Sequence, residues 1–182
     1  MKAFLDIETG GYSIDKNGVC EIGLVVVNDN LEPIAQFHTY IQPYYRPCGI
    51  ELVSYKDDAM AVNGLTVEKL IAEGVPLEFA MKRMQETISY YKISGLIGHN
   101  IPAFDVPRVN YIAGKCGNAG MLMGMSIECT LKMSREKWPA AKSHKQPDLL
   151  KELGIANPNA HTAIGDCLGN IELYKKITGW NQ

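Results

Sequence analysis

Three stretches with the composition of β-strands follow one another at the start of the chain, before any helical pattern appears. They run over residues 3–7, 22–27 and 37–41, separated by turns rich in glycine and asparagine. β-Branched side chains are frequent in the second stretch, and Pro43 ends the third. The short turn at residues 28–30 favours an antiparallel pair. The chain is therefore restricted to folds whose sheet begins with antiparallel strands.

Helical patterns and a short strand alternate in the rest of the chain. Together with the first three strands they predict a mixed α/β sheet flanked by α-helices, in a single domain of 182 residues. In chain order we expect an irregular segment over 44–63, a short helix capped by Thr66 and ended by Gly74, a helix over 77–91, a buried strand over 96–98, a helix from Pro102 to about residue 113, a glycine-punctuated loop over 114–124, and helices over 149–153 and 163–178.

The bulk composition is that of an ordinary globular protein, with a formal net charge of −2. This charge excludes binding of nucleic acid through overall basicity, so a polyanionic substrate would need a local basic patch or bound cations. No CxxC pair is present, which predicts buried, reduced thiols. The first apolar stretch is too short for a signal peptide or a membrane span, so we expect a cytoplasmic protein without membrane contact. The cysteines are Cys20, Cys48, Cys116, Cys129 and Cys167.

Two acidic residues, Asp6 and Glu8, stand at the end of the first strand. Residues i and i+2 of a strand point to the same face, so both carboxylates would point toward one place. Two anions beside a buried strand are unfavourable unless a cation lies between them, and carboxylate oxygens suit Mg²⁺ or Mn²⁺. This motif alone is equally compatible with a strand that has already ended and two carboxylates solvated in a turn.

Two further segments place acidic residues near the ends of elements. Asp105 falls in the first turn of the helix after the 96–98 strand, where a carboxylate is favourable in any protein. His161 and Asp166 are five residues apart, about 140° on a continuous helix, so they converge only if His161 precedes the helix. Residues 157–159 favour a break there. Taken singly, these residues are better read as caps or surface groups.

Joined, the segments supply four carboxylates and one histidine. Four converging carboxylates can bind two divalent cations about 3.5–4 Å apart, which clamp the attacking and leaving oxygens of a phosphoryl displacement. A histidine with a pKa near 6.5 can take a proton from the attacking water. The combination predicts metal-dependent hydrolysis of a phosphoester.

The order and spacing of these motifs resemble the DEDDh branch of the DnaQ-like 3′→5′ exonucleases, which have an RNase H-like fold. The resemblance spans essentially the whole chain. The matching segments are DIETGG with Asp6 and Glu8, GHNIPAFD with Asp105, HTAIGD with His161 and Asp166, the loop over 62–66 near the substrate's 3′ end in that family, and the short helix over 147–155.

The resemblance implies an RNase H-like mixed sheet and a 3′→5′ exonuclease that releases nucleoside 5′-monophosphates by a two-metal mechanism. Asp6, Glu8 and Asp166 would hold the metal that activates water, with Asp6 bridging to a second metal that Asp105 supports. His161 would be the general base. The residues expected to contact the terminal nucleotide are Thr9, Gly10, Asn63, Leu65 and Phe104.

Two departures from the family pattern bear on the substrate. Gly10 stands where a threonine is common, and the second motif has one more residue between Asn100 and Phe104 than many members. The second motif is similar to that of some polymerase proofreading domains. On this ground we expect DNA, single-stranded, in preference to RNA, and a DNA polymerase or another replication or repair protein as partner.

A basic stretch lies between the second and third motifs, with Trp138 inside it. It is either a guide for a phosphate backbone or, with slightly more weight, a solvated flexible loop. Arg108, one turn after Asp105, is a second candidate phosphate contact. The basic stretch comprises Lys132, Arg135, Lys137, Lys142, His144 and Lys145.

Three other hypotheses remain open from the sequence. The chain could be an exoribonuclease of the same family, a catalytically silent nucleic-acid-binding or polymerase-accessory module on the same fold, or a hydrolase of small phosphoesters. Clustered carboxylates without metals would carry a standing electrostatic cost, which argues against the silent module.

Overall fold

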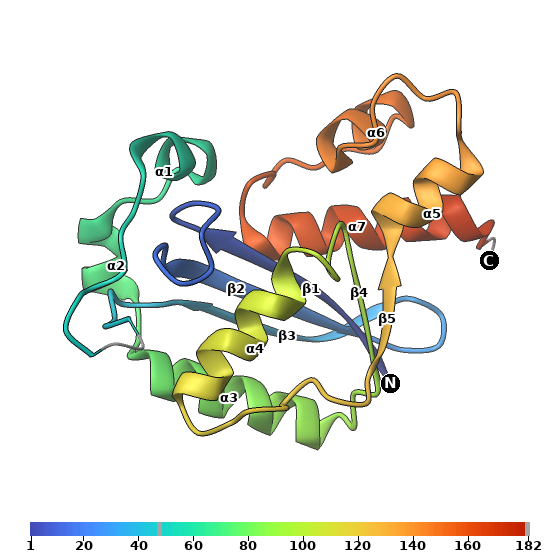
Figure 1. Ribbon diagram of the computed structural model, residues 1–182. Coiled ribbons are helices and arrows are strands. Elements are labelled where there is room, and N and C mark those ends of the chain that lie inside the picture. Colours follow the sequence, from blue (N-terminus) through green and yellow to red (C-terminus); the bar gives the residue numbers. More distant parts are fainter. Residues whose placement is uncertain (47–48, 181–182) are drawn as a thin grey trace.

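A five-stranded sheet with helices on both faces forms the structure, a computed structural model that describes residues 1–46 and 49–180 (Figure 1). The strand order is β3-β2-β1-β4-β5. The strands in the described residues are β1 (Lys2–Thr9), β2 (Val19–Val27), β3 (Pro33–Tyr40), β4 (Gly95–Gly98) and β5 (Ser126–Cys129). The helices there are α1 (Asp57–Asn63), α2 (Val67–Glu73), α3 (Leu77–Tyr90), α4 (Asp105–Lys115), α5 (Thr130–Lys137), α6 (Gln146–Glu152) and α7 (Ala163–Thr178).

The sheet is mixed. β1 pairs antiparallel with β2, and β2 pairs antiparallel with β3. On its other side β1 pairs parallel with β4, which pairs parallel with β5. The carboxyl ends of β1 and β4 therefore lie at the same edge of the sheet. The expected α/β class, with its first three strands antiparallel, is confirmed.

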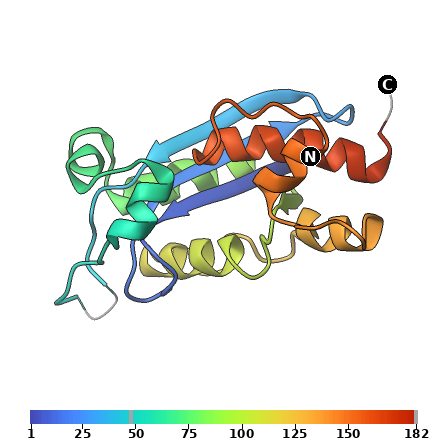
Figure 2. The same ribbon diagram turned by 90° about the horizontal axis from the view of Figure 1, so that it is seen from above.

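Alternate residues along the strands face different helices, as the period of a β-strand requires. Leu5 belongs to a core with Met81 of α3 and Val109 of α4. Phe4 belongs to a second core with Ile171 of α7. Figure 2 shows α7 lying along the sheet. In the part of the chain that the structure describes, no helix is long and apolar enough to cross a membrane.

Several predicted elements are confirmed closely. The helices expected over 77–91 and 163–178 are α3 and α7. The hydroxyl of Thr66 accepts a hydrogen bond from the backbone N–H of Lys69 at the start of α2, and Gly74 follows its last residue. These helices combine an apolar stripe or a capping side chain with a clear stop signal, which are local features of the sequence.

Other boundaries were wrong. β3 starts at Pro33 rather than at 37, because it is a partly exposed edge strand without an apolar pattern. The helix expected from Pro102 begins at Asp105, because residues 101–104 form a turn. The helix expected over 149–153 is α6, which begins three residues earlier, at Gln146.

Three elements were not expected. α1 occupies the end of the segment predicted to be irregular, with only Met60 and Asn63 buried. β5 and α5 also lack a clear apolar pattern, and the buried residues of α5 are Thr130 and Ser134.

Phe79, assigned to the apolar stripe of α3, is 53% exposed, and its neighbours Leu77 and Ala80 are buried in its place.

The thiols divide into two groups. Cys20 and Cys167 are buried as expected, whereas Cys116 and Cys129 are only partly buried, at the ends of α4 and β5. Cys48, together with Pro47, lies outside the described residues.

Candidate active site

β1 positions the first two carboxylates. Leu5 and Ile7 are buried in the core formed with α3 and α4, so Asp6 and Glu8 share the opposite face with Phe4, the face that α7 covers. β1 continues through both acidic residues and ends at Thr9, so neither carboxylate lies in a solvated turn. The expectation that the pair shares one face of a strand is confirmed.

The first turn of α7 carries Asp166. Thr162 caps this helix, and its hydroxyl accepts a hydrogen bond from the N–H of Gly165 at 3.1 Å. Gly23 of β2 allows the turn to approach the sheet, because a Cβ there would lie 2.6 Å from the helix backbone. Gly23 is paired with Asp6 in the sheet. The close approach therefore brings Asp166 beside Asp6.

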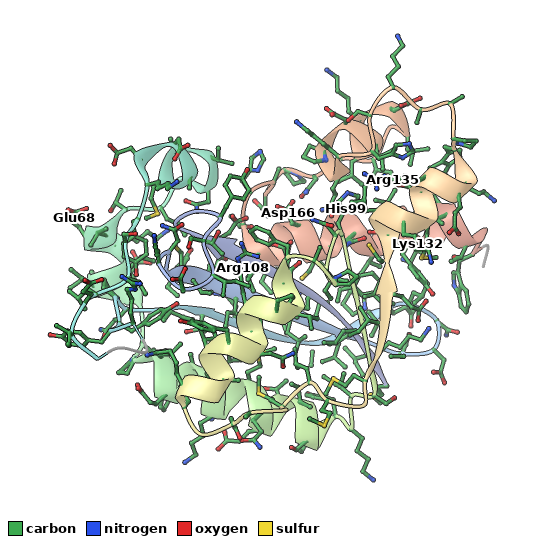
Figure 3. All side chains as sticks on the ribbon, in the orientation of Figure 1. Glu68, His99, Arg108, Lys132, Arg135 and Asp166 are labelled. Atoms are coloured by element: carbon green, nitrogen blue, oxygen red, sulfur yellow. The ribbon has the colours of Figure 1, made fainter. Side chains whose placement is uncertain are left out.

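Three carboxylates meet at this point. Asp6, Glu8 and Asp166 each offer an oxygen, and these oxygens lie within 4.8 Å of one another. All three side chains are partly exposed. Figure 3 shows Asp166 between the sheet and the helices at the carboxyl end of β4. Residues more than 150 positions apart in the chain thus form one acidic cluster.

Asp105 lies behind this cluster rather than within it. It is 2% exposed, and its Oδ1 accepts a hydrogen bond from the backbone N–H of Ile7 at 3.1 Å. Ile7 separates Asp6 from Glu8 in β1, so Asp105 fixes the strand at the point where it presents both. The expected position of Asp105 in the first turn of a helix is confirmed.

The cluster is electrostatically strained. Burial, followed by the charges of Asp105 and Glu8, raises the pKa of Asp6 well above its usual value. Burial and the nearby Asp166 raise the pKa of Glu8 to about 8. Burial raises the pKa of Asp105 to about 7, and it also raises that of Asp166. Full ionisation near neutral pH therefore requires positive charge beside these groups.

A divalent cation fits this donor set. The three clustered side chains offer only carboxylate oxygens, which are the ligands that Mg²⁺ and Mn²⁺ prefer. A cation among them would remove the repulsion that raises their pKa values. The geometry and the electrostatics of the cluster are thus both those of a site that could hold a divalent cation.

Polar contacts orient Asp166. Its Oδ1 accepts hydrogen bonds from the side-chain amides of Asn157 at 3.1 Å and Gln146 at 3.4 Å. Its Oδ2 accepts one from the backbone N–H of His161 at 3.2 Å. Neither amide was expected from the sequence, since nothing in a single Asn or Gln distinguishes a supporting contact from a surface residue.

His161 precedes α7, as its convergence with Asp166 requires. The backbone φ of His161 is +64°, and the residue is exposed to solvent. The closed turn before it depends on Gly165, because a Cβ at that position would overlap the carbonyl of Asn159. The imidazole is thus carried on a turn at the rim of the acidic cluster.

The residues expected to contact a nucleotide lie on the other side of Glu8. Thr9 and Phe104 line a small cavity of about 260 Å³ that also includes Glu8 and Tyr12. The rings of Phe104 and Tyr12 meet edge to face, with centroids 6.4 Å apart. This cavity is the aromatic side of the site.

The remaining three of these residues, Gly10, Asn63 and Leu65, are buried and do not line this cavity; Leu65 lines a separate pocket with Tyr55 and Met60. The Asn63 amide donates to the Thr9 carbonyl at 3.4 Å, and its Oδ1 accepts from the Leu65 N–H at 3.1 Å. Gly10 departs from the threonine of the family pattern that the sequence resembles, and a Cβ there would lie 2.5 Å from the Tyr55 ring.

Arg108 does not face solvent, contrary to its reading as a phosphate contact. It is 6% exposed, its guanidinium donates to the carbonyls of Phe104 at 2.9 Å and Tyr12 at 2.5 Å, and it stacks 3.7 Å from the Phe104 ring centroid. Because both acceptors belong to the walls of the small cavity, Arg108 holds those walls together. The basic stretch is helical only in its first half: Lys132, Arg135 and Lys137 belong to α5, whereas Lys142, His144 and Lys145 lie in the segment between α5 and α6.

Glu21 is a site residue that sequence reasoning missed. It is 1% exposed and lies directly opposite Glu8 in the β1–β2 pair. Its Oε1 interacts with His38 Nε2 at 2.7 Å and accepts the Ala163 N–H at 3.2 Å, whereas its Oε2 has no hydrogen-bond partner among the described residues. A lone carboxylate inside the apolar run VCEIGLVVV was the signal that could have identified it.

The mixed sheet, the acidic residues at the ends of its strands and the helix that supplies Asp166 define an RNase H-like domain with a carboxylate site. The chain belongs to the exonuclease family (RNase_T), which it matches over residues 3–174. It is a DnaQ-like 3′→5′ exonuclease, as the resemblance implied.

Relatives named after DNA polymerase III are similar over nearly the whole chain. The DNA polymerase III subunit epsilon of Aquifex aeolicus is 24% identical, over 95% of this chain and 78% of that protein. The subunit epsilon of Buchnera aphidicola (subsp. Acyrthosiphon pisum) is 29% identical, over 96% of this chain and 71% of that protein. The PolC-type DNA polymerase III of Clostridium perfringens is 27% identical over 93% of this chain, which spans only 11% of that relative.

Solved structures confirm the fold. A zinc-bound complex of E. coli ExoI with single-stranded DNA matches 98% of this chain with a TM-score of 0.82 and 19% identity. Another exonuclease I structure matches 96% with a TM-score of 0.80. The chain spans about 40% of these exonuclease I chains.

Proposed function

We propose that the chain is a single metal-dependent exonuclease domain that removes nucleotides from the 3′ end of nucleic acid, with single-stranded DNA as its preferred substrate and nucleoside 5′-monophosphates as products. One observation carries this proposal: three carboxylates from β1 and α7 converge within 4.8 Å, with Asp105 fixed directly behind them. Such a set suits two divalent cations and an in-line phosphoryl displacement.

Asp6, Glu8 and Asp166 would hold the cations, and Asp105 would support them through its bond to β1. Bound Mg²⁺ or Mn²⁺ supplies positive charge that stabilises the charge developing on the phosphoryl oxygens. His161 at the rim would accept the proton of the attacking water.

The aromatic cavity would take the terminal nucleoside. Thr9 and Phe104 line it directly, whereas Asn63 and Leu65 shape its wall from behind. A buried guanidinium holds this wall rigid, which would fix the last nucleotide relative to the carboxylates.

The preference for DNA is supported by relatives that are DNA polymerase III subunits and by the complex of ExoI with single-stranded DNA. A DNA polymerase is accordingly the protein partner that we propose, and the cysteine pattern supports a reducing, cytoplasmic compartment. Matched DNA and RNA oligomers test the preference directly. Faster shortening of RNA would assign the chain as an exoribonuclease instead.

Labelled single strands test the activity itself. With Mg²⁺ we expect shortening of a 5′-labelled strand one nucleotide at a time, and with EDTA none. Asp6→Ala is expected to abolish the reaction, whereas Asp29→Ala, in the exposed β2–β3 turn, is the acidic control. If no DNA or RNA strand is shortened, the chain is a silent binding module.

A further inference from the structure

A second, larger cleft lies on the opposite side of the acidic cluster from the aromatic cavity. Its volume is about 550 Å³, and Asp6 and Asp166 form one end of it. Its other lining comes from the residues after β4, from α5, from the segment that joins α5 to α6, and from the first turn of α6. Figure 3 shows His99, Arg135 and Asp166 together in this region. The cleft is therefore continuous with the proposed catalytic site.

Positive charge is concentrated in this cleft. Arg135, Lys142 and Lys145 line it, while Lys132 and Lys137 of the same basic stretch do not. All five side chains are exposed, so the distinction is one of position and not of burial. The smaller aromatic cavity has a single lysine, Lys56, and two acidic residues, Glu8 and Asp58. The two ends of the site thus differ in chemistry: rings on one side, cations on the other.

His99 fixes the segment that carries the cations. Its Nε2 lies 2.8 Å from the carbonyl oxygen of His144, which can only accept, so Nε2 carries the proton. Burial lowers the pKa of His99 to about 4, so the ring is neutral and its Nδ1 accepts from the Thr130 hydroxyl at 3.1 Å. One partly buried ring therefore joins the end of β4, α5 and the α5–α6 segment.

Two further contacts complete this anchoring. His144 Nδ1 is hydrogen-bonded to the Ser134 hydroxyl at 3.1 Å. The Gln146 amide donates to the backbone carbonyl of Asp166 at 2.9 Å. The segment is consequently held at a set position relative to the acidic cluster, which is what a preorganised anion site needs.

On the basis of the proposed function, we infer that this cleft binds the phosphate backbone of the substrate strand on the 5′ side of the scissile phosphate. The last nucleoside occupies the aromatic cavity, the scissile phosphate lies at the carboxylates, and the next phosphates meet Arg135, Lys142 and Lys145. These cations stabilise phosphates whatever the base sequence. The cleft thereby distinguishes a strand from a small phosphoester.

Matched lysine pairs test this inference. K142A/K145A removes two cations from the cleft, and K132A/K137A removes two from the same basic stretch outside it. Binding of a fluorescent single strand is measured in EDTA, which stops hydrolysis, as a function of salt. Each phosphate contact on a single strand contributes about −0.7 to the slope of log K against log salt. We expect K142A/K145A to flatten the slope by about 1.4 and K132A/K137A to leave it unchanged.

Kinetics give an independent readout. The 5′-(p-nitrophenyl) ester of thymidine monophosphate has a scissile phosphodiester and no further phosphate. In K142A/K145A and in R135Q we expect the ratio of kcat/KM for an oligonucleotide to that for the ester to fall at least about tenfold, mainly through KM. Equal effects of the two lysine pairs would overturn the inference, because net charge alone would explain them.

The two proposals fail in different ways. If the wild-type protein hydrolyses neither probe with Mg²⁺, the exonuclease proposal fails, while the salt slopes still decide whether the cleft binds phosphates. If the wild type hydrolyses both probes and the lysine pairs behave alike, only the cleft assignment falls. Circular dichroism of each variant checks that these exposed substitutions leave the fold intact.

Discussion

Replacing Asp105 with asparagine is expected to make the metal-free protein more stable at pH 8 while destroying its metal-dependent activity. The asparagine amide has nearly the same shape, and its oxygen can still accept the Ile7 N–H. The substitution therefore removes a buried charge together with its attraction to the Arg108 guanidinium. The wild-type Asp105 is 2% exposed, and its carboxylate lies beside a cluster of other acidic groups.

The sign of the effect follows from the direction of the pKa shift. The pKa of Asp105 rises from 3.8 to about 7 on folding, so the protonated side chain favours the native state at low pH. Stability is lost as the pH rises through this range, because the charge is costlier in the folded protein. About three pKa units at 1.36 kcal/mol each set a ceiling of about 4 kcal/mol. Relaxation of the protein around the charge lowers this ceiling. We expect the unfolding free energy of D105N at pH 8 to exceed that of the wild type by about 2 kcal/mol or more.

Chemical denaturation in EDTA at pH 4 and at pH 8 measures this effect. The variant and the wild type should unfold with similar free energies at pH 4, and the variant should be the more stable at pH 8. Mg²⁺ should narrow the gap, since only the wild type retains the full site; a ligand at 100 times its Kd adds about 2.7 kcal/mol. D29N is the exposed control. A wild type as stable as the variant at pH 8 in EDTA would refute the reasoning.

The remaining predictions concern the support of α7 and the proton acceptor. H161A is expected to slow hydrolysis about 10²–10⁴-fold with oligonucleotide binding in EDTA retained; an unchanged rate removes the role of general base. E21A should lower the free energy of unfolding by about 1–3 kcal/mol, because the Ala163 N–H and His38 lose their shared acceptor, whereas E21Q should lose less. G165A should displace the turn at Asn159 and weaken Mn²⁺ binding measured by calorimetry, with G114A, whose added methyl meets nothing within 4 Å, as the neutral comparison.

Local rules were enough to predict much of the site. A D-x-E pair at the end of an apolar strand shares a face because of the two-residue period of a strand, and Asp6 and Glu8 do so. A helix break before Ala163 follows from residues 157–159, and it places His161 ahead of α7. These features depend on sequence neighbours, so a single sequence contains them.

What was missed depends on contacts between distant segments. α5 has little apolar surface and buries Thr130 and Ser134, whose hydroxyls contact His99 and Leu131 in the folded protein. The side-chain partners of Asp166 are the amides of Gln146 and Asn157, which no sequence pattern marks. Arg108 is buried where its guanidinium donates to the carbonyls of Phe104 and Tyr12. Such roles are set by tertiary geometry, which local periodicity does not encode.

The bond between Asp105 and the Ile7 N–H joins positions 98 residues apart, and Asp166 comes later still. During synthesis the ribosome releases β1 long before either partner exists. A nascent or prematurely terminated chain that stops short of Asp166 therefore lacks one of the three clustered carboxylates. Under the proposed function, we expect such fragments to be inactive toward nucleic acid.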